Sequence, residues 1–129
     1  MKTYMTARED YLKAIFVLQN KLGEVHSVDV ARYLGVSKPS VSQAVGVLTK
    51  EGYLFVDQKH VLHLTEYGED TAEKVYDKHC FFSSHLISLG VNPTIAEEDA
   101  CRMEHAISEE SFQKLKEAWS NIGLDEKVS

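Results

Sequence analysis

The sequence predicts a mainly α-helical protein with a small β-wing, in which an N-terminal winged helix-turn-helix is followed by a second helical domain. Residues 25–51 hold two helical patterns joined by a short glycine-containing turn, which is the arrangement of a helix-turn-helix. Two short β-rich runs come next, and helical patterns continue after them. We therefore expect two domains, residues 1–65 and residues 66–129.

Three helices are expected in the first domain. Residues 7–20 place apolar residues three and four positions apart, the spacing of an amphipathic helix. A second helix is expected within residues 25–36, with Ser27 as its N-cap. A third helix begins after Ser37, whose hydroxyl suits an N-cap, and ends at Gly52.

A β-wing and three further helices complete the expected fold. Residues 53–58 and 60–65 read as two short strands joined by a tight turn. Residues 65–90 predict one long helix that connects the two domains, with Thr65 and Gly68 near its start and Gly90 at its end. Residues 95–107 and 108–122 predict two more amphipathic helices.

Composition predicts a soluble, cytoplasmic protein. The chain has 129 residues, of which 43% are hydrophobic, and no apolar run approaches the roughly 20 residues that cross a bilayer. The acidic residues Glu9 and Asp10 do not fit a signal peptide. We expect the two cysteines, Cys80 and Cys101, to stay reduced.

Charge is divided unevenly along the chain. Residues 1–65 contain eight Lys and Arg against six Asp and Glu, whereas residues 66–129 contain six against fourteen. The net charge of −6 therefore hides a slightly basic half and a strongly acidic half. This asymmetry is consistent with a first domain that faces phosphates and a second domain that attracts cations.

The third helix carries the candidate DNA-contacting residues. The first residues of a helix in the major groove reach base edges, while cationic groups nearby contact phosphates. Gln can pair with adenine, and Lys suits phosphate oxygens. The candidates are Ser37, Lys38, Pro39, Ser40, Ser42, Gln43 and Lys50, with Lys59 on the wing. A winged helix that contacts only proteins is the alternative.

The stretch CRMEH gathers three potential metal ligands. Cys101, Glu104 and His105 stand at positions i, i+3 and i+4, which share one face of a helix. A thiolate, a carboxylate and an imidazole together suit Fe²⁺, Co²⁺, Ni²⁺ or Zn²⁺. Three ligands are too few for a closed site, so we expect Asp10, and also His79, to contribute. A chance trio on a structural helix is the alternative.

Several segments in order resemble the diphtheria toxin repressor family of metal-dependent transcriptional regulators, including its manganese-sensing branch. They are TAREDYLKAIFVL, VARYLGVSKPSVSQAVGVLTKEGYL, LHLTEYGE, KHCFFSSHLISLGV and EEDACRMEHAIS. The resemblance covers roughly residues 7–120. It implies an N-terminal winged helix, a C-terminal helical dimerisation domain and a metal bound between them. The SH3-like third domain of longer relatives is expected to be absent.

The resemblance also implies roles for individual residues. Cys101, Glu104 and His105 match the family's metal-binding helix, and His79 matches the histidine on its long connecting helix. Asp10 falls on the N-terminal ligand position, where manganese-sensing relatives have aspartate and iron-sensing relatives commonly have methionine. Cys101 instead follows the iron-sensing pattern, in which manganese-sensing relatives have glutamate.

The metal assignment is therefore mixed. We expect Fe²⁺ as the first choice and Mn²⁺ as the next. We also expect Co²⁺, Ni²⁺ or Zn²⁺ to substitute in vitro, because the Irving–Williams order gives these ions a higher affinity for such ligands. The resemblance offers His79 and Glu97 as ligands of a second ion.

The expected function is that of a homodimeric, metal-activated repressor that binds operator DNA and controls genes of metal homeostasis. No membrane and no small-molecule substrate are expected as partners. One alternative is a metalloenzyme with Glu104 as its base, against which stands the lack of an accompanying nucleophile or glycine-rich substrate loop. Another is a winged-helix interaction module that holds a structural Zn²⁺.

Overall fold

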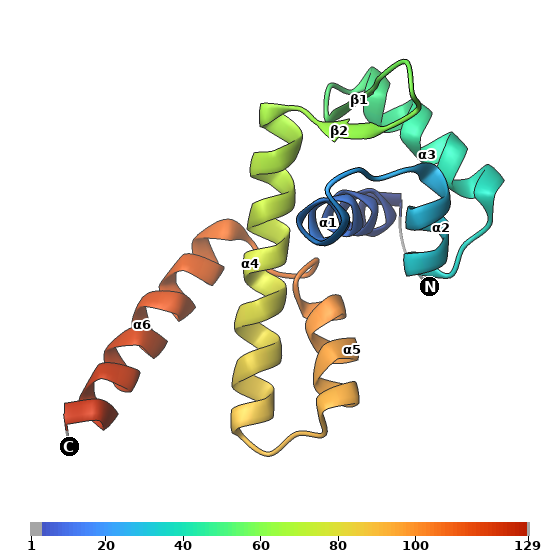
Figure 1. Ribbon diagram of the computed structural model, residues 1–129. Coiled ribbons are helices and arrows are strands. Elements are labelled where there is room, and N and C mark those ends of the chain that lie inside the picture. The colour runs from blue at the N-terminus through green and yellow to red at the C-terminus, as the bar shows by residue number, and fades with distance from the viewer. Residues whose placement is uncertain (1–3, 129) are drawn as a thin grey trace. The chain divides into compact units, whose positions relative to one another are not determined.

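The computed structural model describes residues 4–128, and the side chains of residues 8–120 (Figure 1). The chain forms two compact units, Met1–Tyr76 and Asp77–Ser129, which divide inside the helix α4 (Glu66–Ser88). The fold class predicted from the sequence is confirmed, since the described chain is mainly helical with one two-stranded sheet. A domain boundary after residue 65 stays a prediction.

The first unit is a winged helix. Its elements before α4 are α1 (Tyr4–Leu22), α2 (Ser27–Leu34), α3 (Lys38–Lys50), β1 (Leu54–Val56) and β2 (Leu62–Leu64). The strands pair antiparallel, with Leu54 opposite Leu64. Helices α2 and α3 follow each other across a short turn, so the helix-turn-helix and the wing lie where the sequence predicted them.

The termini of α2 and α3 follow from local hydrogen bonds. Gly35 ends α2 with a φ of 69°, a left-handed conformation that costs glycine little. The Ser37 hydroxyl accepts a hydrogen bond from the Ser40 backbone N–H at 3.2 Å, which confirms Ser37 as the N-cap of α3. The prediction for α2 was wrong by one residue, because its N-cap is His26, whose backbone N–H donates to Asp29 Oδ2 at 2.9 Å.

One apolar core holds the first unit together. Residues from every helix and both strands contribute to it, and most of them are almost fully buried. The core consists of Leu12, Ala14, Ile15, Leu18, Val25, Val30, Ala31, Val41, Leu48, Leu54, Leu62 and Ala72. Burial of so many aliphatic side chains is the main favourable term in folding this unit, and it fixes α3 against α1.

The start of α4 is locked to the end of α3 and the start of the wing. The Thr65 hydroxyl donates to the carbonyl oxygen of Gly52 at 2.7 Å and accepts from the Gly68 backbone N–H at 3.0 Å. A Cβ at Gly68 would lie 1.8 Å from the Tyr53 carbonyl oxygen, so only glycine permits this approach. The Tyr53 and Tyr67 rings also stack, with centroids 4.7 Å apart.

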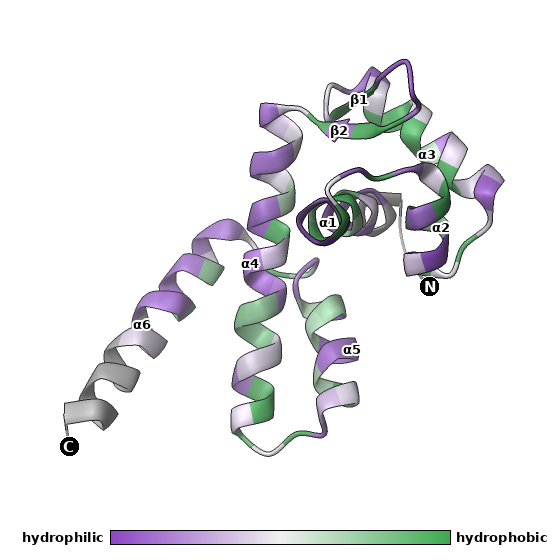
Figure 2. Ribbon diagram, viewed as in Figure 1, coloured by the Kyte–Doolittle hydropathy of each residue, from purple (hydrophilic) through white to green (hydrophobic). Residues whose placement is uncertain are grey.

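The second unit contains the C-terminal half of α4, α5 (Pro93–Met103) and α6 (Glu109–Val128). Figure 2 shows hydrophobic residues on the C-terminal half of α4, and a mixture of hydrophobic and hydrophilic residues on α5. Phe82, Ala100 and Phe112 form its buried core, one from each helix. The helix predicted over residues 95–107 is shorter than expected, because α5 ends at Met103 and a turn follows.

None of the helices among the described residues combines the length and the apolar character that a membrane crossing requires.

Asp57 organises the turn of the wing. Its Oδ1 accepts hydrogen bonds from the backbone N–H groups of Lys59 at 2.8 Å and Val61 at 3.0 Å, and its Oδ2 lies 2.9 Å from His63 Nε2. The hydrogen bond from His63, followed by the one from Val61, lowers the pKa of Asp57 from 3.8 to about 2. The ionised carboxylate of Asp57 therefore stabilises the turn between β1 and β2.

A depressed carboxyl pKa stabilises the wing above pH 3.8, and this contribution is lost as the pH falls toward 2. We predict that Asp57→Ala speeds hydrogen exchange at the Lys59 and Val61 amides at neutral pH, and that acidification toward pH 2 lowers the protection of the same wild-type amides relative to their intrinsic exchange rates at each pH. Amide exchange followed by NMR measures both effects. Asp70→Ala, which removes an exposed carboxylate from α4, is the control. Unchanged exchange in Asp57→Ala would contradict the role of the carboxylate.

Candidate functional site

The candidate DNA-contacting residues share an exposed surface of the first unit. All eight are exposed, namely Ser37, Lys38, Pro39, Ser40, Ser42, Gln43, Lys50 and Lys59. Seven of them lie on α3 or at its N-cap, while Val41 and Leu48 point the opposite face of α3 into the core. The helix therefore presents a polar, partly cationic face that a major groove can accept.

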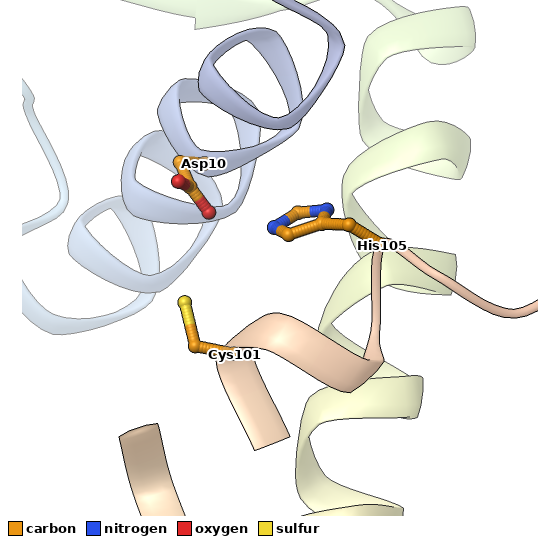
Figure 3. A group of neighbouring side chains, drawn as sticks. All are labelled: Asp10, Cys101 and His105. Carbon is orange, nitrogen blue, oxygen red and sulfur yellow. The ribbon is translucent and has the colours of Figure 1, made fainter. Parts of the chain in front are cut away.

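Cys101 and His105 come together in the second unit. Cys101 lies in the last turn of α5 and His105 in the turn that follows it, as Figure 3 shows. Each offers a potential metal-ligand atom, and these atoms lie within 4.8 Å of each other. The His105 side chain is only 6% exposed. A thiol and an imidazole at this separation can bind one transition-metal ion.

Glu104 lies between them in sequence but turns to a different partner. It caps the C-terminus of α5, and its fully buried carboxylate lies 2.8 Å from His79 Nδ1. Its other oxygen is 3.9 Å from His105 Nε2. Because α5 ends at Met103, the helical spacing that predicted three side chains on one face does not extend to Glu104 and His105.

A second set of polar side chains surrounds His79. Its Nε2 lies 2.7 Å from Glu97 Oε2, so the imidazole is held between two carboxylates. The Ser83 hydroxyl donates to the other Glu97 oxygen. The structure thus joins His79 and Glu97, the candidate ligands of a second ion, to Glu104 in one hydrogen-bonded network. Sequence spacing alone gave no signal for this hydrogen-bonded network, because its residues come from α4 and α5, which are separate in the sequence.

Asp10 lies on α1 in the first unit. Although Asp10 is a charged residue, it is only 4% exposed. A carboxylate is seldom buried without a charged or hydrogen-bonding partner, so burial marks Asp10 as a residue with a specific interaction.

The donor set fits a divalent transition metal. Carboxylate oxygens suit Mn²⁺ and Fe²⁺, imidazole suits most first-row ions, and thiolate favours the softer ones. The described residues of the second unit supply all three donor types within a few residues. Cys80 is exposed, and neither cysteine takes part in a disulfide. His85, which is half-buried, instead packs against Phe81 and Trp119.

A winged helix followed by an acidic helical unit with clustered thiol, imidazole and carboxylate groups defines a metal-responsive DNA-binding protein. Comparison with known proteins agrees. Residues 3–62 match "Iron dependent repressor, N-terminal DNA binding domain", and residues 65–127 match "Iron dependent repressor, metal binding and dimerisation domain". The chain belongs to the iron-dependent repressor family, the same family that its sequence motifs resemble.

Individual relatives agree with this assignment. The transcriptional regulator MntR of Escherichia coli O6:H1 is 35% identical over 108 residues, which cover 84% of this chain and 70% of that protein. The solved structure of the manganese regulator SloR has a TM-score of 0.78 at 28% identity over 88% of this chain. That of IdeR from T. acidophilum has a TM-score of 0.75 at 27% identity over 93%.

The chain spans about half the length of these solved structures, 53% for SloR and 55% for IdeR. MntR is described as a transcriptional regulator and SloR as a manganese regulator, so the comparisons favour a regulator over the metalloenzyme alternative. The expected preference for iron over manganese is not supported, because the family is described as iron-dependent whereas SloR is described as a manganese regulator.

Metal binding at Cys101 can be tested with Co²⁺, whose bond to a thiolate gives a near-ultraviolet charge-transfer band. We expect the band to appear with the wild type and to be lost in Cys101→Ser, because an alcohol does not replace a thiolate as ligand. Cys80→Ser is the matched control, since Cys80 is exposed, and it should keep the band. A band that survives in Cys101→Ser and vanishes in Cys80→Ser would place the metal elsewhere.

Proposed function

We propose that this protein is a homodimeric repressor that binds operator DNA through α3 and the wing when a divalent metal occupies the second unit. The observation that carries the proposal is the pairing of two features on one chain. One is the exposed polar face of α3, and the other is the cluster of Cys101, Glu104 and His105 around the end of α5.

The proposed ligands come from both units. Cys101, Glu104 and His105 belong to the second unit, and we assign Asp10 of the first unit as their partner. Such a ligand set would let one divalent cation fix the DNA-binding unit relative to the second unit. His79 and Glu97 would hold Glu104 in place and are the candidate ligands of a second ion.

The two units divide inside α4, so the DNA-binding unit continues directly into the helix that carries His79. Ligands on both sides of this division would favour the arrangement in which two recognition helices reach operator half-sites together. A metal that binds this arrangement more tightly than others shifts the population toward it. Acid should weaken metal binding, because Cys and His must lose protons to become ligands.

Exposed apolar residues of the second unit support a homodimer. Ile87, Leu89, Ile95, Met103, Leu115 and Trp119 are all exposed on this small unit. Scattered apolar residues are normal on a surface, but six large ones on about fifty residues indicate an interface. A groove lined by Phe82, Met103, Ile107 and Leu115, among others, lies on the same unit. A dimer that acts on operator DNA would reside in the cytoplasm.

The activating metal is Fe²⁺ or Mn²⁺ in this proposal, and Cys101 sets the balance between them. Asp10 and Glu104 offer hard oxygen donors that suit both ions. The thiolate of Cys101 favours Fe²⁺, the softer of the two.

The proposal predicts that metal strengthens DNA binding by about 5- to 150-fold, the usual range of coupling between two sites. Anaerobic fluorescence anisotropy measures this with a palindromic duplex enriched from a random library in the presence of Fe²⁺ or Mn²⁺. His105→Ala and Glu104→Gln should lose the metal response, whereas His85→Ala in the same unit should keep it. Gln43→Ala should weaken binding to the enriched duplex by roughly 1–3 kcal/mol with unchanged metal affinity.

Equal DNA affinity with metal and with a chelator would contradict the proposal. Circular dichroism supplies the control for the alternative of a structural zinc site. Chelation should leave the helical signal intact if the metal regulates, and should unfold the second unit if the metal is structural.

Replacement of Cys101 by Glu tests the assignment of metal preference. We predict that Cys101→Glu shifts relative affinity from Fe²⁺ toward Mn²⁺, since it exchanges the softest donor for a hard carboxylate. Competition between the two ions, followed by metal analysis of the protein, measures the shift. An unchanged ratio would show that other residues determine the preference.

A further inference from the structure

A groove lined by residues of α1 and α3 lies entirely within the first unit, and it reaches from exposed residues of α3 to the core residue Leu48. It has a volume of about 350 Å³. Its lining combines Arg8 and Tyr11 of α1 with Ser40, Gln43, Ala44, Val47 and Leu48 of α3. The α3 wall therefore includes Ser40 and Gln43, two of the residues assigned to DNA. A molecule that enters this groove would meet Arg8 as well as Ser40 and Gln43.

Arg8 is the cation of this groove. Its Nε lies 3.0 Å from Glu51 Oε1, and the two side chains are 35% and 38% exposed. A half-exposed ion pair of this kind is weak, because water solvates both partners and salt screens their attraction. A phosphate can replace such a carboxylate, since its oxygens accept the same N–H donors and its charge is as large.

We propose that Arg8 contacts a DNA phosphate that lies along this groove, and that Glu51 holds the guanidinium in place until DNA displaces it. This inference rests on the proposed use of α3 in DNA binding and adds a contact from α1. We assign one occupant to the groove. It is the phosphodiester backbone that flanks the bases contacted by α3. Charge complementarity with Arg8 and continuity with Ser40 and Gln43 support this choice.

The contact would also compensate for the sparse positive charge of α3. Only Lys38 and Lys50 carry a cationic side chain on that helix. Phosphate contacts supply most of the sequence-independent affinity of DNA-binding proteins, so a further arginine beside α3 adds to an otherwise small set. Arg8 therefore orients the first unit on the backbone, while Gln43 reads a base.

The test measures the affinity of the metal-loaded protein for a mixed-sequence duplex over a range of salt concentrations. Each phosphate contact contributes about 0.9 to the slope of log K against log salt, so Arg8→Ala should lower the slope by about 2 in a dimer that loses two contacts. Affinity at low salt should fall by about tenfold or more. Arg8→Lys should keep most of the slope, because lysine retains the charge.

Glu51→Gln should tighten binding by about two- to fivefold, because it removes the competing carboxylate. In the Arg8→Ala background this gain should be smaller, which a double-mutant cycle detects. Lys21→Ala is the matched control. Lys21 is an exposed cation on the same helix about 20 Å from Arg8, and its loss should leave slope and affinity unchanged.

The outcomes separate this inference from the proposed function. If the wild type binds DNA in a metal-dependent way but Arg8→Ala keeps its slope and affinity, the phosphate contact is wrong while the repressor function stands. If the wild type binds no duplex with or without metal, both fail. Thermal unfolding of each variant is the control for folding. We expect unfolding temperatures close to that of the wild type, because the loss of an exposed ion pair should change stability little.

Discussion

The buried carboxylate of Glu104 is the constraint on which the second unit depends. A carboxylate taken out of water is costly unless hydrogen bonds or cations compensate for the lost hydration. Here His79 lies 2.8 Å away, and His105 lies 3.9 Å from the other oxygen. His79 in turn contacts Glu97, so one buried group orders residues from α4, α5 and the turn after α5. A divalent cation is the natural further partner of such a set.

A second constraint acts at the start of α4. The backbone of Gly68 packs so closely on the Tyr53 carbonyl that no side chain fits there, and Thr65 closes the same joint with two hydrogen bonds. The winged helix is thereby attached rigidly to the first turns of α4. A signal that acts on the C-terminal half of α4 thus has a continuous helix through which to reach the DNA-binding unit.

Most of the fold could be predicted from the sequence, because its signals are local. The apolar spacing in α1, the cap at Ser37 and the β-rich runs of the wing each specify an element without help from distant residues. Local signals failed where tertiary contacts decide. The periodic pattern continued past Met103, yet the chain turns there and Glu104 becomes a helix cap.

The sequence nominates the residues of the candidate site, but it does not show which of them contact one another. Residue types and their spacing identified Cys101, Glu104, His105 and His79. No pattern in the sequence reveals that Glu104 turns to His79 while Cys101 and His105 approach each other. Arg8 escaped prediction for a related reason. Its proposed role depends on a groove that α1 and α3 form together, and the lining residues of the two helices are at least 29 positions apart in the sequence.

The central claim is that metal and operator DNA bind one common arrangement of the protein. Metal affinity measured with and without a saturating enriched duplex tests this most directly, because coupling between two ligands is reciprocal. The account predicts that DNA tightens metal binding by the same factor by which metal tightens DNA binding. Metal affinity that is identical with and without the duplex would contradict it.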